Sequence, residues 1–136
     1  MKTGVLDTSA LLALLWQEPG WQEVSAALDD ATCLMSAVNV AELAAKAQER
    51  RAIGEKDIRA LLAELPLEIV PLDGEQAIAV GLLRSATRHL GLSLGDRACL
   101  VLARREKSTV FTADRPWLDL SASLGLDIRC IRPDAH

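Results

Sequence analysis

Four acidic residues, far apart in sequence, lie at the ends of predicted strands or near the starts of predicted helices, where their carboxylates could form one site. Asp7 and Asp114 each follow a short apolar run that is typical of a buried strand. Asp96 opens an apolar helical segment, and Glu42 lies in the second turn of another. The carboxyl ends of parallel strands and the starts of the following helices meet at one edge of a sheet, so we expect the four side chains to converge there.

Clustered carboxylates repel one another and raise each other's pKa unless a cation sits among them. No Cys or His ligand stands next to these acids in the sequence, and an all-oxygen donor set selects a hard ion, Mg²⁺ or Mn²⁺. A metal ion held in this way typically serves phosphoryl chemistry, by activating water and by stabilising charge on the phosphate. The pattern therefore indicates metal-dependent hydrolysis of a phosphate ester.

Asp7 and Asp114 also have purely structural interpretations. Asp7, or one of the hydroxyls after it, can cap the helix that follows, since Asp, Ser and Thr are preferred N-cap residues. Asp114 precedes Arg115 and Pro116, and Pro suits the first position of a helix, so a turn or cap explains this acid as well.

Structural interpretations exist for Glu42 and Asp96 too. Glu42 stands four residues before Lys46, in the order that favours a helical ion pair. Ser93 and Asp96 have capping-box spacing, with Asp in place of the usual Glu. Gly95, a poor helix former, immediately precedes Asp96 and indicates that some group approaches the backbone closely there.

Four segments together resemble the PIN-domain nucleases, and in particular the VapC-type toxins of bacterial toxin–antitoxin pairs. They are Val5-Leu6-Asp7-Thr8-Ser9, the stretch from Ser36 to Glu42, Leu92-Ser93-Leu94-Gly95-Asp96-Arg97-Ala98 and Thr112-Ala113-Asp114-Arg115-Pro116-Trp117. The resemblance spans nearly the whole chain and implies a metal-binding and catalytic role for its matching acids, Asp7, Glu42, Asp96 and Asp114. It also implies that three hydroxyl side chains contact and orient these acids without binding the metal themselves, namely Thr8, Ser9 and Thr112.

The activity that the resemblance implies is hydrolysis of RNA by an endoribonuclease with Mg²⁺ or Mn²⁺, leaving 5′-phosphate and 3′-hydroxyl ends. Arg97 and Arg115 adjoin two of the acids and are candidates to hold phosphate oxygens, although surface ion pairs would explain them equally well. The same resemblance implies a cognate antitoxin protein and a homodimer within a toxin–antitoxin complex.

Apolar residues of the first helix, Leu12, Leu15 and Trp16, could form a groove for a helix of that antitoxin. We expect the antitoxin's C-terminal segment to lie over the early helices and to direct a basic side chain at Asp7 and Asp96. The alternative is that these apolar side chains belong to the core.

Other classes of protein compete with this interpretation. A PIN-like module that binds RNA or protein without cutting is the main alternative, and loss of one acid would favour it. A haloacid-dehalogenase-like phosphatase requires a second Asp at the position that Ser9 occupies, so this class is not favoured. A receiver domain requires an acid pair near the first strand and a late lysine, and the sequence has neither.

The elements that must position the acids alternate between strands and helices. We expect strands at 3–7, 32–35, 68–70, 109–112 and 127–131. We expect helices at 9–17, 21–29, 37–51, 55–65, 73–89, 93–106 and 117–124. This order predicts an α/β fold: a single PIN-like domain over 1–136, with a central parallel sheet of about four to five strands and helices on both faces.

Composition and charge indicate which ligands and which cellular compartment suit the protein. The chain of 136 residues is 50% hydrophobic and carries a net charge of −4, but residues 84–115 carry +4, which is compatible with phosphate binding. Three cysteines far apart in sequence are typical of reduced thiols in a cytoplasmic protein. No apolar run is long enough to cross a membrane, and with 3% aromatic residues a stacking platform for bases is not expected.

Overall fold

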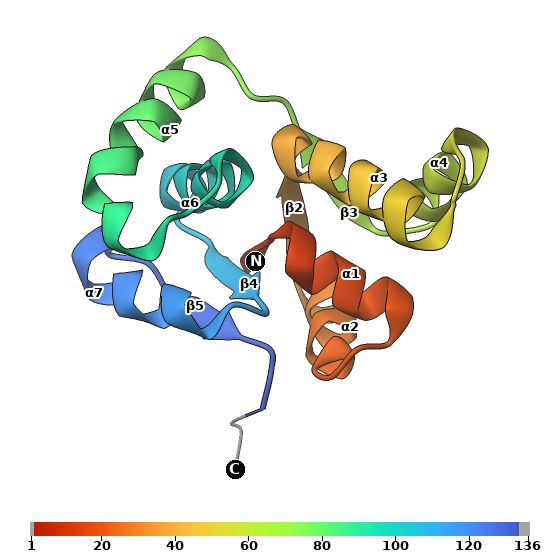
Figure 1. The fold of residues 1–136 in the computed structure, drawn as a ribbon. Helices are drawn as coiled ribbons and strands as arrows, with labels where there is room; N and C mark the ends of the chain where they lie inside the picture. The colour runs from red at the N-terminus through yellow and green to blue at the C-terminus, as the bar shows by residue number, and fades with distance from the viewer. Residues whose placement is uncertain (1, 134–136) are drawn as a thin grey trace.

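A five-stranded parallel sheet forms the centre of the computed structural model, which describes residues 2–133 (Figure 1). The strand order is β3-β2-β1-β4-β5, and every neighbouring pair is parallel. The strands are β1 (Thr3–Leu6), β2 (Thr32–Ser36), β3 (Leu67–Val70), β4 (Thr109–Thr112) and β5 (Ile128–Cys130). The predicted α/β fold with a parallel sheet is confirmed, and each predicted strand lies within about two residues of its expected place.

Seven α-helices connect and cover these strands in residues 2–133. They are α1 (Thr8–Trp16), α2 (Trp21–Asp30), α3 (Ala37–Arg51), α4 (Glu55–Ala63), α5 (Gly74–Ala86), α6 (Leu94–Glu106) and α7 (Ser121–Leu124). Short 3₁₀ helices occupy Arg88–Leu90 and Arg115–Leu120. None of these helices is long and apolar enough to cross a membrane.

The predicted helix 73–89 is too long by one turn. The α-helix ends at Ala86, and the hydroxyl of the buried Thr87 donates to the carbonyl of Leu83 at 2.9 Å. A threonine hydroxyl that bonds the preceding turn competes with helix propagation, and a 3₁₀ turn follows. The predicted helix 117–124 divides similarly into a 3₁₀ helix and α7.

Helices cover both faces of the sheet, as predicted (Figure 1). Val5 of β1 belongs to the core cluster that contains the apolar face of α6, whereas the next residue, Leu6, belongs to the cluster of α1 and α2. Successive strand residues point to opposite faces, so a strand that is apolar at both must be covered on both. Helix α5 packs on the outside of α6, and α3 contacts both α1 and α6.

The order of the strands creates a switch point between β1 and β4. From β1 the chain proceeds to β2 and β3 on one side, and then returns to β4 and β5 on the other. In open α/β sheets, ligands bind outside the carboxyl ends of the strands at such a point. Leu6 and Phe111 pair in register here, and the residues that follow the two strands therefore lie side by side.

Candidate active site

Asp7 occupies the switch point and is almost completely buried, with 2% of its surface exposed. One carboxylate oxygen accepts the Thr112 hydroxyl at 2.6 Å, and the other accepts the backbone N–H of Ala10 at 2.7 Å. The Ser9 hydroxyl lies 2.8 and 2.9 Å from the two oxygens. Burial raises the pKa of Asp7 to about 7, these donors oppose the rise, and the charge of Asp114 adds to it.

The hydroxyls around Asp7 also connect it to the turn that carries Asp114. The Ser9 hydroxyl accepts the backbone N–H of Ala113 at 2.9 Å, and the Thr112 hydroxyl accepts that of Asp114 at 3.0 Å. Two of the three side chains predicted to support the site, Ser9 and Thr112, therefore join α1 to the end of β4.

Glu42 is held by residues of α1 and α3. The Thr8 hydroxyl lies 3.0 Å from Glu42 Oε1 and 3.1 Å from the backbone carbonyl oxygen of Asn39, either of which can accept its proton. The Asn39 side-chain amide lies 3.3 Å from the same Glu42 oxygen. The Ser93 hydroxyl lies 3.5 Å from Oε2, at the limit of a hydrogen bond. No ion pair joins Glu42 to Lys46 in the part of the chain that the structure describes, so the expected helical pair does not account for this acid.

The glycine before Asp96 makes room for Glu42. A Cβ atom at Gly95 would lie 2.0 Å from Glu42 Oε1 and 2.3 Å from its Cδ. The group that approaches the backbone at Gly95 is therefore the carboxylate of Glu42, which reaches the first turn of α6 from α3.

Asp96 takes part in a capping box at the start of α6. Ser93 N–H donates to Asp96 Oδ2 at 3.0 Å, and Asp96 N–H donates to the Ser93 hydroxyl at 3.1 Å. The structural interpretation of Asp96 is thus realised, through one of its two carboxylate oxygens. A capping role does not exclude a second role for the other oxygen.

Asp114 lies in the turn after β4, where its side chain reaches solvent. Partial burial raises the pKa of Asp114, and the neighbouring charge of Asp96 raises it further. Arg132 and Lys46 oppose the rise. Neither cation was predicted to lie near Asp114, because Lys46 is on α3 and Arg132 follows β5, both far from Asp114 in sequence.

A buried thiol shows that the acids share one neighbourhood. Burial raises the pKa of Cys99 well above its usual value, and the charges of Asp7, Asp96 and Glu42 raise it further. The charge of Asp114 raises the pKa of Asp7, and the charge of Asp96 raises the pKa of Asp114. The structure therefore brings the four predicted acids together at one edge of the sheet, which we call the acid rim: Asp7, Glu42, Asp96 and Asp114.

The oxygen donors of the acid rim suit a hard divalent cation by their chemistry. As the side chains lie, however, no three His, Cys, Asp or Glu residues within 2–133 are grouped so that they could hold a metal ion. Asp7, Glu42 and Asp96 each face hydroxyl, amide or backbone donors close to them. Binding by three carboxylates would require some of these side chains to move closer together.

Both arginines that adjoin the acids contact backbone carbonyls. Arg97 donates through Nη1 to Val80 O at 2.8 Å, which ties α6 to α5. Its Nε is buried, with no hydrogen-bond partner in the part of the chain that the structure describes. Arg115 donates through Nη2 to Arg132 O at 2.8 Å. Each guanidinium carries five N–H donors, so further N–H groups stay available for a phosphate oxygen while these bonds persist.

The early helices differ from the predicted groove. Leu12 is buried in the core under α1, with 4% exposed, so its expected place in an open groove is wrong. Leu15 and Trp16 are partly buried against the same core, and the Arg51 guanidinium lies 4.5 Å from the centre of the Trp16 ring. An apolar hollow of about 400 Å³ lies instead between α3 and α4, with Val40, Ala44, Ile58 and Leu62 in its lining.

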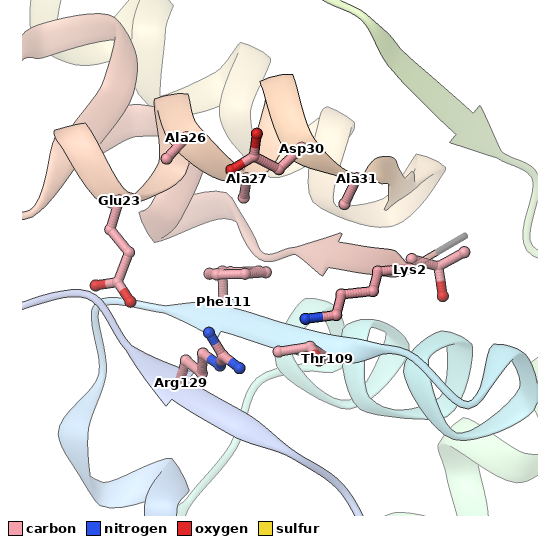
Figure 2. Close-up of a pocket in the computed structure, with 10 residues that line it drawn as sticks. Lys2, Glu23, Ala26, Ala27, Asp30, Ala31, Thr109, Phe111 and Arg129 are labelled. Atoms are coloured by element: carbon pink, nitrogen blue, oxygen red, sulfur yellow. The ribbon is translucent and has the colours of Figure 1, made fainter.

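A separate cavity of about 210 Å³ lies between α2 and the strands β4 and β5 (Figure 2). Glu23 and Asp30 of α2 line one side, and Lys2 and Arg129 line the other around Phe111. None of the acids of the rim lines this cavity. Lys2 precedes β1, so the cavity extends toward the amino ends of the strands, opposite the acid rim.

Comparisons with known proteins agree with the resemblance seen in the sequence. A family model described as the PIN domain matches residues 4–122. No curated protein sequence matches the chain.

Solved structures resemble the chain over nearly its whole length. A chain of a toxin–antitoxin complex from Klebsiella pneumoniae has a TM-score of 0.72 at 18% identity, covering 96% of this chain and 99% of its own. A chain of VapBC-1 from nontypeable Haemophilus influenzae has a TM-score of 0.69 at 20% identity, covering 95% and 98%. A chain of VapBC-5 from Mycobacterium tuberculosis, a member of the VapBC family of toxin–antitoxin systems, has a TM-score of 0.60 at 25% identity, covering 98% and 100%.

Proposed function

The chain belongs to the PIN domain family, and we propose on that basis that it is a VapC-type toxin: an endoribonuclease that hydrolyses RNA phosphodiester bonds with Mg²⁺ or Mn²⁺. The observation that carries the proposal is the acid rim, where shared hydroxyl contacts link carboxylates from separate parts of the chain: Thr112 contacts Asp7 and the backbone of Asp114, and Ser93 lies between Glu42 and Asp96. Gathering these charges destabilises the fold, so their arrangement is explained by a ligand of opposite charge.

In this proposal Asp7, Glu42, Asp96 and Asp114 would hold the ion. The bound ion would supply charge stabilisation at the phosphate and would make an attacking water more acidic. The hydroxyls fix the acids: Ser9 and Thr112 orient Asp7, and Thr8 orients Glu42. The products would carry 5′-phosphate and 3′-hydroxyl ends.

Substrate phosphates need positive charge beside the acids, and the four cations near the rim are candidates to provide it. Lys46 and Arg132 already act on Asp114. Arg97 and Arg115 would contribute through N–H groups other than those that contact the Val80 and Arg132 carbonyls.

The experiment is RNA cleavage by the purified protein with Mg²⁺ or Mn²⁺, then with EDTA, beside the Asp96→Asn variant. We expect chelation and the substitution each to reduce cleavage by more than about 100-fold, beyond the usual effect of losing an outer-shell partner of a metal site. Asn keeps an acceptor for the Ser93 N–H, so the start of α6 is preserved and a thermal melt should show an unchanged or higher midpoint.

Two results would contradict the proposal. Undiminished RNA cleavage in EDTA would show that the reaction needs no metal ion. Full activity in an Asp96→Asn protein that melts at a lower temperature would show that Asp96 is a capping residue only. A protein that binds RNA and cuts none under any condition would favour the alternative of a non-catalytic PIN-like RNA- or protein-binding module.

The proposed partner is a cognate antitoxin. The structures that resemble the chain come from toxin–antitoxin complexes, and the hollow between α3 and α4 has the apolar lining that a partner helix uses. We expect a basic side chain of the antitoxin to reach Asp7 and Asp96. Copurification with a co-expressed neighbouring gene product, and its suppression of RNA cleavage, would test this partner.

A homodimer is proposed through the outer face of α5. Ile78 and Leu82 stand one turn apart there with 67% and 74% of their surface exposed, and Gly81 beside them leaves open space. An antiparallel second copy would cover both side chains and set the first turn, with Glu75, alongside the last turn, with Arg84. Sedimentation should show a dimer that Leu82→Glu converts to a monomer.

A further inference from the structure

A buried amide links three elements behind the acid rim. Asn39 lies in the first turn of α3 with 1% of its surface exposed. Its Nδ2 is 3.0 Å from the carbonyl oxygen of Gly95, 3.3 Å from the Thr8 hydroxyl and 3.3 Å from Glu42 Oε1. One side chain thus contacts α1, α6 and a neighbouring acid on its own helix.

The acceptors around Asn39 determine which way the amide points. The Gly95 carbonyl and the Glu42 carboxylate accept hydrogen bonds, so only the NH₂ group can face them. This orientation leaves Asn39 Oδ1 buried without a hydrogen-bond partner among the described residues. An apolar side chain of the same shape would avoid that penalty, so core packing does not explain the amide, whereas its contacts with Glu42 and Gly95 do.

The contacts of Glu42 are unequal between its two oxygens. Oε1 lies within 3.0 Å of the Thr8 hydroxyl and 3.3 Å of Asn39 Nδ2. Among residues 2–133, the Ser93 hydroxyl at 3.5 Å is the one hydrogen-bond donor found for Oε2. The backbone of Gly95 closes one side, since a Cβ atom there would lie 2.0 Å from Oε1. Oε2 would also lie 2.7 Å from that Cβ atom, so Gly95 accommodates the whole carboxylate, and the two oxygens differ in their hydrogen bonds: Oε1 has the closer donors and Oε2 is the freer to bind a ligand.

We propose that Asn39 is a positioning residue: its amide occupies Glu42 Oε1 so that Oε2 serves the acid rim, and Gly95 provides the space for this arrangement. The inference rests on the proposed function for the nature of the ligand, a divalent cation. Outer-shell partners of this kind orient the ligands of metal sites, and their loss typically costs about 10- to 100-fold in metal affinity or activity.

The first experiment replaces Asn39 with Leu, which keeps the approximate size of the side chain and removes the amide. Titration of the RNA-free protein with Mn²⁺ in a calorimeter should show a dissociation constant about 10- to 100-fold higher than in the wild type. The kcat for RNA cleavage should fall, and KM for RNA should stay within about twofold, because Asn39 is too deeply buried to touch RNA.

The matched control is Gln76→Leu. Gln76 is also a buried amide, 3% exposed, and its Nε2 donates to the carbonyl of Pro71 at 3.1 Å, on α5 rather than at the rim. This variant should melt earlier and bind Mn²⁺ as the wild type does. A lower melting midpoint in Asn39→Leu with an unchanged Mn²⁺ dissociation constant would overturn the proposal.

Gly95→Ala tests the same arrangement without touching Asn39. The added methyl group meets the end of a flexible side chain, Glu42, and alanine suits a helix better than glycine. The protein should therefore fold, with an unchanged or higher melting midpoint, and should bind Mn²⁺ about 10- to 100-fold more weakly. Wild-type Mn²⁺ affinity in this variant would overturn the role assigned to Gly95 and to the position of Glu42.

A double-mutant cycle separates this inference from the proposed function. In metal-free protein, the melting shifts of Asn39→Leu and Glu42→Met should not sum to that of the double variant, because the two side chains contact each other. Additive shifts would overturn the positioning of Glu42 by Asn39. A wild-type protein that binds no Mn²⁺ and cuts no RNA would overturn the proposed function, whichever result the cycle gives.

Discussion

Two helices of the molecule begin with an aspartate in the same backbone geometry. Asp7 precedes α1 with φ −84° and ψ 176°, and Asp73 precedes α5 with φ −85° and ψ 176°. Each carboxylate accepts the backbone N–H three residues later, at 2.7 Å from Ala10 and at 2.8 Å from Gln76. As local motifs, the two N-caps are the same.

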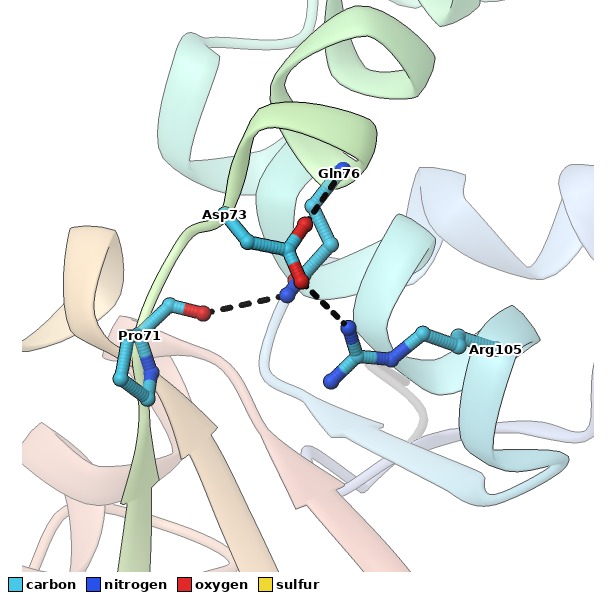
Figure 3. Close-up of polar contacts among 4 residues, drawn as sticks. All are labelled: Pro71, Asp73, Gln76 and Arg105. Carbon is cyan, nitrogen blue, oxygen red and sulfur yellow. Dashed lines mark hydrogen bonds and ion pairs between the residues drawn. The ribbon is translucent and has the colours of Figure 1, made fainter.

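Their surroundings differ in burial and in the sign of the neighbouring charge. Asp73 is exposed, and the Gln76 N–H lowers its pKa, with a smaller contribution from Arg105, whose guanidinium lies 3.2 Å away (Figure 3). Asp7 is buried, and its pKa rises to about 7 through burial, with a further contribution from the charge of Asp114. The charged form of Asp73 is stabilised by folding, whereas that of Asp7 is destabilised. A cap that is unfavourable as a charge is explained by a further role, and the acid rim supplies one.

The largest expected effect is on activity. Asp7→Asn should reduce metal-dependent RNA cleavage by more than about 100-fold, because the variant loses a carboxylate of the rim, whereas outer-shell losses cost about 10- to 100-fold. Asp73→Asn should cleave like the wild type, because Asp73 lies at the start of α5 and not at the rim. Initial rates on one RNA at saturating Mg²⁺ compare the two variants directly.

Equal loss of activity in both variants would break the comparison. It would mean that removing the charge of either N-cap aspartate disturbs the enzyme alike, and that the position of Asp7 at the switch point has no special part in catalysis.

The next effect is on stability, and its sign depends on pH. The pKa of Asp7 rises from 3.8 to about 7 on folding, so the unfolded chain loses this proton first as the pH increases. In metal-free protein, the stability linked to Asp7 is therefore fully present below pH 3.8, falls between pH 3.8 and about 7, and stays low above it. The shift is equivalent to roughly 4 kcal/mol at most.

Asp7→Asn should consequently stabilise the metal-free protein at pH 8 by about 1–3 kcal/mol, less than the full equivalent, because the amide has one acceptor fewer for the surrounding hydroxyls. Asn is as good an N-cap as Asp, so α1 should be unaffected. Urea unfolding at pH 5 and pH 8 should show the gain shrinking at the lower pH. An unchanged free energy of unfolding at both pH values would show that Asp7 acts as a cap alone, because Asn caps a helix as well as Asp.

The comparison also indicates what the sequence could reveal. The apolar runs before Asp7 and Asp114 predicted strands that end at one edge of a parallel sheet, and both the strands and their convergence are observed. Helix α3 was predicted with its observed bounds, because Ser36 caps it and the apolar pattern continues to Arg51. Local patterns and a simple topology rule were sufficient for these features. The metal-binding role of the four acids stays a prediction.

Contacts between distant segments could not be predicted in this way. Asn39 and Gly95 are 56 positions apart, and no local sequence pattern predicts their hydrogen bond. The glycine itself was a signal that some group approaches, but it did not identify Glu42. Leu12 and Leu15 look alike in the sequence, and only the packing of α1 on the sheet decides that Leu12 is fully buried. Likewise, whether an N-cap aspartate is buried depends on the rest of the fold.

The smallest expected effect concerns the other side of the comparison, the exposed cap at Asp73. Its pKa is lowered on folding, so its stabilising contribution is present above pH 3.8 and is lost as the pH falls below that value. The pH dependence of stability that is linked to Asp73 is therefore opposite in direction to that of Asp7 and lies at lower pH.

The largest cause of the lowered pKa of Asp73 is the backbone N–H of Gln76, which a substitution of Arg105 leaves in place. Arg105→Gln should therefore move the melting midpoint at pH 7 by less than about 3 °C, as expected for an exposed ion pair. The difference should vanish in 1 M salt, where the Debye length is about 3 Å. A larger, salt-independent loss would mean that the Arg105 side chain contributes through packing on α6, and the charge-based contrast between the two caps would then be incomplete.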